Sequence, residues 1–288
     1  MRDLNYELKQ LCLRNRDGSY ATQHAREAIL AQIANQLHAL GFKDMKATSL
    51  KPKHVTALVE HWKAESLSPG TIKNRMTELR WWAEKVNKQN VMARDNASYG
   101  IPQRQYVTNV SQSRCLTSGD LARITDPYTR LSLKLQAAFG LRREESIKIR
   151  PAWADGGDRL TLKASWTKGG RPREIPIRNV HQRQVLNEAR ELAGIGSLIP
   201  QDRTYVQQLQ RFKAQCQAAG IQHVHGHRHQ YAQDRYQELT GWRCPAQGGP
   251  TSKQLSLEQK GQDRQARLTI SAELGHGRER IVAVYIGR

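Results

Sequence analysis

The sequence predicts a mainly α-helical protein with one small β-sheet, an α+β fold in two domains. Its 288 residues are enough for about two domains of roughly 150 residues each. Apolar residues recur at spacings of three and four along most of the chain, which is typical of amphipathic helices. The runs 159–163 and 173–177 flank a turn at 167–170 and predict one β-hairpin, and Pro176 confines the second strand to an edge.

Residues 20–90 are predicted to form a small helical domain. Its first helix carries an apolar stripe from Ile29 to Leu40 and ends at Gly41, a residue type typical of helix C-termini. A second helix begins after Pro52. The third begins at Ser68-Pro69, where a hydroxyl N-cap precedes a proline in the first turn.

Residues 116–288 are predicted to form the second domain, which holds the hairpin. Thr117 and Asp120 have the spacing of a helix cap. An apolar helix over 131–139 is expected to end near Gly140. Further helices are expected over 180–193 and 204–219, from about His225, and over 267–274 and 279–286.

Three segments lack a sustained apolar period and are expected to lie outside the packed helices. Residues 1–19 are polar and charged, and they predict an N-terminal arm. Residues 91–115 have the composition of an interdomain linker. Residues 241–262 are rich in Gly, Pro, Gln and Ser, and they predict a mobile inserted loop.

The charge balance indicates a polyanionic partner. Lys and Arg number 46 against 26 Asp and Glu, which gives a net charge of +20. Such a surplus favours a nucleic acid held through its phosphates. The alternative from charge alone is a generic basic protein, such as one associated with the ribosome.

The sequence also excludes several classes of protein. No apolar run reaches the roughly 18 residues that a membrane span needs, and the first ten residues lack the apolar core of a secretory signal. Cys12, Cys115, Cys216 and Cys244 lie far apart without a CxxC pair, which argues against a disulfide framework or a zinc ribbon. We therefore expect a cytoplasmic protein without a membrane partner.

Four short patterns carry candidate chemistry. They are Gly140–Glu145 (GLRREE), Thr167–Arg173 (TKGGRPR), His225–His229 (HGHRH), and Leu274–His276 (LGH) with Tyr285 nine residues later. The third also has the composition of a metal site. Alternate residues on a helix, however, point about 200° apart, so its three histidines cannot converge on one ion. We expect no metal and no cofactor.

In this order and spacing, the four patterns resemble the catalytic domain of the tyrosine recombinases, the family of the phage integrases. The family pattern is GLRxxE, a lysine on a hairpin turn, HxxRH, and LGH with a tyrosine nine residues on. The chain matches it at Arg142, Glu145, Lys168, His225, Arg228, His276 and Tyr285. Residues 20–90 resemble the family's helical core-binding domain, which would end with the stretch SPGTIKNRMTELRWW.

The resemblance implies a site-specific recombinase or integrase of a mobile element. Tyr285 would attack a DNA phosphate and form a 3′-phosphotyrosyl link, which keeps the phosphodiester energy so that ATP is unnecessary. Arg142 and Arg228 would bind the phosphate, because guanidinium groups suit a developing negative charge where no metal is used. Lys168 would protonate the leaving 5′-oxygen.

Further residues have supporting roles under this resemblance. His225 would act as an acid or base near neutral pH, and His276 would hydrogen-bond a phosphate oxygen. Glu145 is expected to support Arg142 or a histidine. The basic residues expected to contact DNA phosphates are Lys73, Arg75, Arg80, Arg171 and Arg173.

The resemblance also implies double-stranded DNA as the partner, held by a C-shaped clamp of the two domains. A homo-oligomer on DNA (dimer or tetramer), accessory DNA-bending proteins and association with the nucleoid are expected. The chain stops three residues after Tyr285, where many members have another helix, so assembly through that helix is not expected. Ile281, Val282, Val284 and Ile286 would either form the contact between copies or pack within their own chain.

Two features depart from the family pattern. Gly226 and His227 stand where the family commonly has Asp and Leu, which affects the placement of the preceding histidine. The 48 residues from Arg228 to His276 exceed the usual spacing, and the excess coincides with residues 241–262. This inserted loop would contact DNA, regulate access or have no role.

Three alternative functions fit part of these observations. A type IB topoisomerase uses similar chemistry to relax supercoiled DNA. A DNA-binding or architectural factor would keep the pocket as a relic, although a relic is expected to lose at least one of the six reactive residues. A ribosome- or RNA-binding basic protein would explain the charge but not the ordered motifs.

Overall fold

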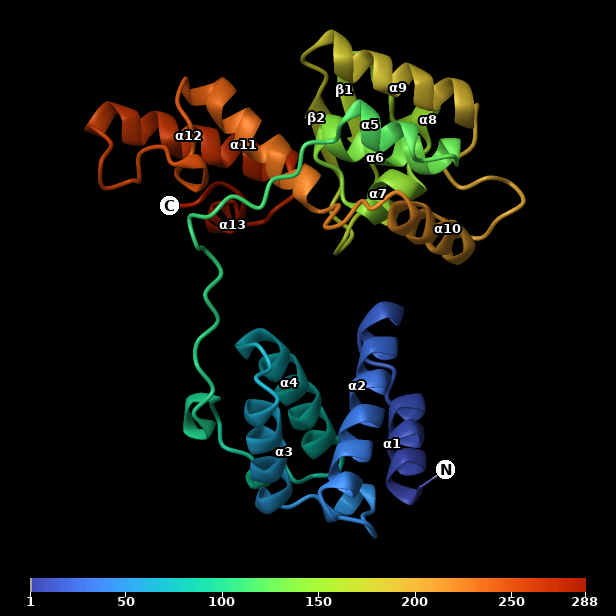
Figure 1. The fold of residues 1–288 in the computed structure, drawn as a ribbon, viewed down its shortest axis with the longest axis vertical. Helices are drawn as coiled ribbons and strands as arrows, with labels where there is room; N and C mark the ends of the chain where they lie inside the picture. Colours follow the sequence, from blue (N-terminus) through green and yellow to red (C-terminus); the bar gives the residue numbers. More distant parts are fainter. Residues whose placement is uncertain (1) are drawn as a thin grey trace. The chain divides into compact units, whose positions relative to one another are not determined.

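A computed structural model describes residues 2–288, and the contacts between residues divide the chain into two compact units. The first unit runs to Gln105 and the second from Tyr106 to Arg288 (Figure 1). This division falls inside the segment 91–115, where the sequence predicts a linker. No helix among the described residues is long and apolar enough to cross a membrane.

The first unit is helical, and its helices begin where the sequence offers caps. The hydroxyls of Ser19 and Ser68 accept hydrogen bonds from the backbone N–H groups of Thr22 and Thr71. The elements are α1 (Asp3–Arg14), α2 (Tyr20–Ala39), α3 (Pro52–Ala64) and α4 (Pro69–Lys85), with the 3-10 turns η1 (Ala47–Ser49), η2 (Gln89–Val91) and η3 (Ala97–Tyr99).

Two tryptophans lie at the centre of this unit's core. Trp62 of α3 and Trp82 of α4 are fully buried. Their indole N–H groups donate to Gln36 Oε1 at 2.9 Å and to the Ala47 carbonyl at 2.8 Å. Because an unmade buried hydrogen bond costs about 1–3 kcal/mol, these two bonds fix α3 against α2 and α4 against η1.

The expectation of an N-terminal arm over residues 1–19 is wrong for Asp3–Arg14, which form α1. Leu4 and Leu8 of this helix are buried in the core of the first unit, and α1 packs against α2. Leu11 continues the same face three residues further on. The apolar stripe is thus present in the sequence, but charged residues on the other faces obscure it.

The second unit combines helices with one hairpin, and α6 lies at its centre against α7, α9, α10 and α11. The elements are α5 (Ser118–Ala122), α6 (Pro127–Phe139), α7 (Arg143–Lys148), α8 (Pro151–Ala154), β1 (Arg159–Leu162), η4 (Ala164–Trp166), β2 (Arg173–Pro176), α9 (Val180–Ala193), α10 (Tyr205–Ala218), α11 (Gly226–Thr240), η5 (Pro245–Gln247), α12 (Leu257–Glu273), η6 (Glu279–Ile281) and α13 (Ala283–Ile286) (Figure 1).

The predicted hairpin is present. Strands β1 and β2 pair antiparallel, with Leu160 opposite Ile175 and Leu162 opposite Arg173. These four residues share the buried face of the hairpin, since alternate residues of a strand point to the same side. Arg173 therefore occupies a position that an apolar residue would normally fill.

The predicted loop over 241–262 is present over 241–256, where η5 is the only regular element, but the prediction is wrong for 257–262, which belong to α12. Cys244 and Ala246 belong to the core of the second unit, and η5 packs against α13. Helix α12 begins at Leu257, within this segment, because the Ser256 hydroxyl caps its first turn. Polar composition concealed a short buried turn and a normal helix start.

The apolar residues near the end of the chain divide between the two expected roles. Val282 and Ile286 are fully buried within their own chain. Ile281 and Val284 are 37% and 41% exposed. Packing within the chain therefore accounts for two of the four.

Candidate active site

The first sequence pattern lies where α6 ends. Gly140 has the left-handed conformation (φ 61°) with which many helices terminate. Arg142 then precedes α7, and Glu145 accepts from the backbone N–H of Arg142 at 2.7 Å and from its Nη1 at 2.8 Å. The spacing of three residues thus lets one carboxylate cap the helix and hold the arginine side chain.

Glu145 is fully buried and is shared by two guanidinium groups. Besides Arg142, it accepts two hydrogen bonds from Arg173 of β2, at 2.9 and 2.6 Å. Burial alone would raise the pKa of Glu145, but the hydrogen bonds and charge of Arg173, together with Arg142, lower it to about 2. The carboxylate is ionised at neutral pH and connects α7 to the hairpin.

The third pattern forms the start of α11, with Arg228 in its first turn. Arg228 is 1% exposed, and its Nη atoms donate to the carbonyls of Gly140 and Leu274. These carbonyls lie at the C-termini of α6 and α12, where the helix dipole favours a cation. Burial lowers the pKa of Arg228 to about 10, so the group stays charged at neutral pH.

Tyr285 of α13 lies beside this guanidinium. Arg228 Nε donates to Tyr285 Oη at 3.3 Å, and Tyr285 is only 6% exposed. The Tyr285 carbonyl accepts from Gln233 Nε2 at 2.9 Å. Helix α11 thus holds both the phenol and the backbone of Tyr285.

Three imidazole rings surround the ring of Tyr285. The ring centroids of His225, His229 and His276 lie 5.9, 4.6 and 5.4 Å from it. His276 Nε2 also lies 3.4 Å from Nη2 of Arg228. The fold thus brings the third and fourth sequence patterns together around one phenol.

The histidines of this cluster are neutral at neutral pH. Burial, and then the charge of Arg228, lower the pKa of His225 to about 4 and that of His276 to about 3. His225 is the more exposed of the two, so solvent screens more of the effect there. A neutral imidazole has one nitrogen that accepts a proton, so the site contains proton acceptors beside Tyr285.

Lys168 lies outside this cluster. It is exposed in the turn between β1 and β2, and within the described chain its ammonium has no hydrogen bond or ion pair. Gly169 and Gly170 follow it with φ of 78° and 65°, and nothing lies within 4 Å of where a Cβ would stand. Lys168 is therefore not held against the cluster. Arg171 of the same turn lies against Gly277, where its guanidinium occupies the space of a Cβ, and Arg173 holds the base of the hairpin.

Sequence reasoning missed the position of two residues. Arg173 is expected to contact DNA, but it is 8% exposed and paired with Glu145. The signal was its place two residues before buried Ile175, on the same face of the strand. His229 had no expected role, yet its spacing of four from His225 places the two rings 5.6 Å apart.

The other residues expected to bind DNA differ in exposure. Lys73 and Arg80 line a hollow of about 450 Å³ beside α4. Arg75, by contrast, is buried, with its guanidinium 5.3 Å from the ring of Trp62, so it does not lie on the expected surface. Arg171 is exposed on the hairpin turn.

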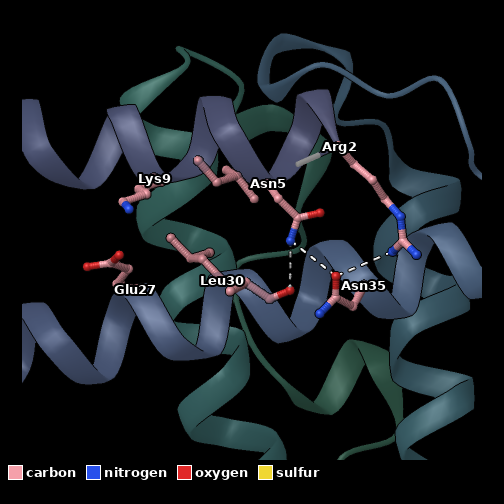
Figure 2. Close-up of a pocket in the computed structure, with 8 residues that line it drawn as sticks. Arg2, Asn5, Lys9, Glu27, Leu30 and Asn35 are labelled. Atoms are coloured by element: carbon pink, nitrogen blue, oxygen red, sulfur yellow. Dashed lines mark hydrogen bonds between the residues drawn. The ribbon is translucent and has the colours of Figure 1, made fainter.

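A separate hollow of about 490 Å³ lies between α1 and α2 in the first unit. Asn5 of α1 points toward Asn35 of α2 in Figure 2. It donates to the carbonyl of Ala31 at 3.3 Å and to Asn35 Oδ1 at 3.1 Å. Arg2 donates to the same Asn35 oxygen at 3.4 Å. These polar groups hold α1 against α2, and none of the residues expected to be catalytic lines this hollow.

Comparison with known proteins agrees with these two units. A family model described as phage integrase, N-terminal, matches residues 1–91, and one described as integrase matches residues 104–234. His276 and Tyr285 lie beyond the second match. A sequence search of curated proteins gives no match.

Solved structures share the fold over nearly the whole chain. A lambda integrase dimer bound to a COC′ core site is 16% identical, with a TM-score of 0.64 over 98% of this chain and 76% of that one. XerH recombinase in a post-cleavage complex with difH substrate is also 16% identical, with a TM-score of 0.57 over 98% and 80%. The Tn1549 transposon integrase with circular intermediate DNA is 14% identical, with a TM-score of 0.56 over 100% and 96%.

The two family models cover most of both units, and the fold agrees with solved members from end to end. The resemblance seen in the sequence motifs and the mainly helical fold with one small hairpin are therefore both confirmed. This chain belongs to the tyrosine recombinase family, whose members are enzymes that cleave and rejoin DNA.

Proposed function

We propose that this chain is a site-specific recombinase in which Tyr285 cleaves one DNA strand through a 3′-phosphotyrosyl intermediate. The observation that carries the proposal is the 3.3 Å contact between Arg228 Nε and Tyr285 Oη. This guanidinium holds Tyr285 Oη in place through a hydrogen bond. It also lies where negative charge develops when the phenol attacks a phosphate.

In the cleavage step, Tyr285 Oη bonds to phosphorus and the bond from phosphorus to the 5′-oxygen breaks. The phenol proton passes to neutral His225, whose ring lies beside that of Tyr285. The 5′-oxygen takes a proton from Lys168, whose exposed side chain would reach it from the hairpin turn. Rejoining reverses these transfers, and because the number of phosphate ester bonds is unchanged, the reaction consumes no ATP.

The phosphate would be bound by the two arginines and His276. Of the five N–H bonds of Arg228, two donate to backbone carbonyls. Two more lie against Tyr285 and His276, and we assign the remaining one to a phosphate oxygen. The Arg142 side chain is 21% exposed and supplies a second guanidinium from the open side. These fixed cations supply the charge stabilisation, so the proposed reaction needs no metal.

The substrate would be double-stranded DNA, in keeping with the net charge of +20. Recombination exchanges strands between two duplexes, and each of the four strands needs one tyrosine. We therefore expect dimers and tetramers of the chain on DNA. Binding to chromosomal DNA would place the protein on the nucleoid.

A substrate nicked near the cleavage position tests the proposal, because the short 5′-OH fragment diffuses away and the covalent complex accumulates. Wild-type protein should form an adduct that survives denaturation, in the presence of a metal chelator and without ATP. Tyr285→Phe should form none while binding the same DNA, since the phenyl ring fills the same space. A persistent adduct in the Phe variant, or none in the wild type, would refute the proposal.

Joining of two sites separates a recombinase from a topoisomerase-like enzyme. We expect recombinant products from two duplexes that carry the cognate site. Relaxation of a single supercoiled circle without joining would instead support the topoisomerase alternative. Binding without any adduct would support an architectural role.

A further inference from the structure

Arg173 is a buried cation that the proposed chemistry does not use. It is the first residue of β2, five residues after Lys168, and its side chain is 5% exposed. Its Nη atoms donate to both oxygens of Glu145, at 2.9 and 2.6 Å. Its Nε donates to the backbone carbonyl of Glu273 at 2.8 Å. Every nitrogen of the guanidinium thus has a protein partner, which leaves it little capacity to bind DNA.

The contacts of Arg173 join three of the four sequence patterns. Through Glu145 it reaches Arg142, and through Glu273 it reaches the turn that carries His276. A Cβ on Gly275 would lie 2.9 Å from Arg173 Cδ, and this glycine has φ +65°. The glycine of the LGH pattern therefore leaves room for the arginine of the hairpin.

The charge of Arg173 also matters for Arg142. Glu145 contacts both guanidinium groups, so its single negative charge is shared between them. Arg142 is the partner on the open side, with 21% of its side chain exposed against 5% for Arg173. Without Arg173, the whole carboxylate charge would fall on Arg142 and cancel the cation that the phosphate needs.

We propose that Arg173 is a positioning residue of the active site: it neutralises Glu145 so that Arg142 keeps its charge for the phosphate, and it holds the His276 turn in place. The inference rests on the proposed function, since it assigns Arg173 to the reaction of Tyr285. It replaces the expectation that Arg173 contacts DNA directly.

A double substitution separates the charge effect from packing. Arg173→Met keeps the length of the side chain and removes its charge. Glu145→Gln removes the charge that Arg173 offsets, and its amide oxygen still accepts from the backbone N–H of Arg142. The double variant has the same net charge in the cluster as the wild type. Arg159→Met is the matched control, because Arg159 lies on the same hairpin in an exposed ion pair with Glu174.

The readout is the single-turnover rate of adduct formation on the nicked substrate, with the dissociation constant for intact DNA measured alongside. Arg173→Met should slow cleavage by on the order of 100-fold, the usual effect of losing one fixed electrostatic contribution to the transition state. DNA affinity and its salt dependence should stay near the wild-type values. The Arg173→Met/Glu145→Gln variant should cleave at least tenfold faster than Arg173→Met alone. Arg159→Met should cleave at the wild-type rate.

Several results would overturn the inference while leaving the proposed function intact. One is a wild-type rate in Arg173→Met. Another is a double variant no faster than the single, which would make the role merely structural. If Arg173→Met bound DNA more weakly, with an affinity that depends less on salt concentration, Arg173 would instead be a direct contact to a DNA phosphate.

If Arg173→Met fails to fold, Arg173→Lys replaces it. A folded lysine variant should cleave faster at every pH than folded Arg173→Gln, and equal rates would refute the charge argument. Failure of the wild type itself to form an adduct would refute the proposed function instead.

Discussion

Replacing Gly140 by alanine should destabilise the second unit far more than the same change at another helix end. Gly140 terminates α6 with φ +61°, and a Cβ there would lie 2.6 Å from Cδ1 of Tyr231 and 3.1 Å from Cδ2 of Leu274. The Tyr231 ring is buried, and its hydroxyl donates to Glu273 Oε2 at 2.7 Å. The ring therefore has little freedom to move away from a new methyl group.

The magnitude follows from two separate costs. The left-handed conformation costs alanine about 1–2 kcal/mol, and forcing a methyl group into a packed core costs typically about 1–3 kcal/mol more. Gly241 is the matched control, because it terminates α11 with φ +84° and nothing lies within 4 Å of its Cβ position. We expect a loss of about 3.5 kcal/mol for Gly140→Ala and about 1.5 kcal/mol for Gly241→Ala.

Thermal and urea unfolding of the two variants, side by side, measure this difference. For a unit the size of Tyr106–Arg288, a difference of about 2 kcal/mol corresponds to a gap in Tm of roughly 4–8 °C. Gly140→Ala should also slow adduct formation at temperatures where it is folded, because the Gly140 carbonyl holds Arg228. Equal losses of stability in the two variants would refute the steric reasoning.

Two further predictions concern pH and the end of the chain. Folding lowers the pKa of His225 from 6.5 to about 4 and that of His276 from 6.5 to about 3. Because the unfolded chain therefore binds more protons below about pH 6.5, the free energy of unfolding should fall as the pH falls from about 7.5 to 5. In urea titrations His276→Gln should reduce this dependence on pH, and an unchanged dependence would contradict the assignment. The Asn109 side chain accepts from the N–H of Arg288 at 2.9 Å and donates to the Arg288 carbonyl at 3.1 Å. Asn109 has a positive φ, which glycine also adopts, so Asn109→Gly removes only these two bonds. The variant should speed hydrogen exchange over α13, with exchange in α1 as the internal control.

The sequence was sufficient for the parts of the fold that depend on local signals. Ser68 and Pro69 mark the start of α4, and the turn at 167–170 marks the hairpin, because caps and turns are determined by a few neighbouring residues. The order and spacing of the four motifs were sufficient for the family. These signals are short in range or depend on residue identity, so the sequence alone is enough to recognise them.

The sequence was insufficient where a polar residue occupies an unusual environment. Arg173 alternates with Ile175 on the buried face of the hairpin, but a surface is the usual place for an arginine. Its burial depends on Glu145, which is 28 residues away. No local pattern contains that pairing, so the prediction of a DNA contact followed the average behaviour of arginine and not its actual partner.

The two glycine motifs gain a common explanation once Arg228 is in place. A buried guanidinium is unfavourable unless acceptors replace its water, and here the acceptors are carbonyls at the C-termini of α6 and α12. A helix leaves its last carbonyls without partners inside the helix, and a glycine lets the chain turn away so that they stay accessible. Gly140 of GLR and Gly275 of LGH serve this purpose for the same arginine. The motifs therefore encode one cation site assembled from two helix ends, and Tyr285 and His276 lie beside the nitrogens of the same guanidinium.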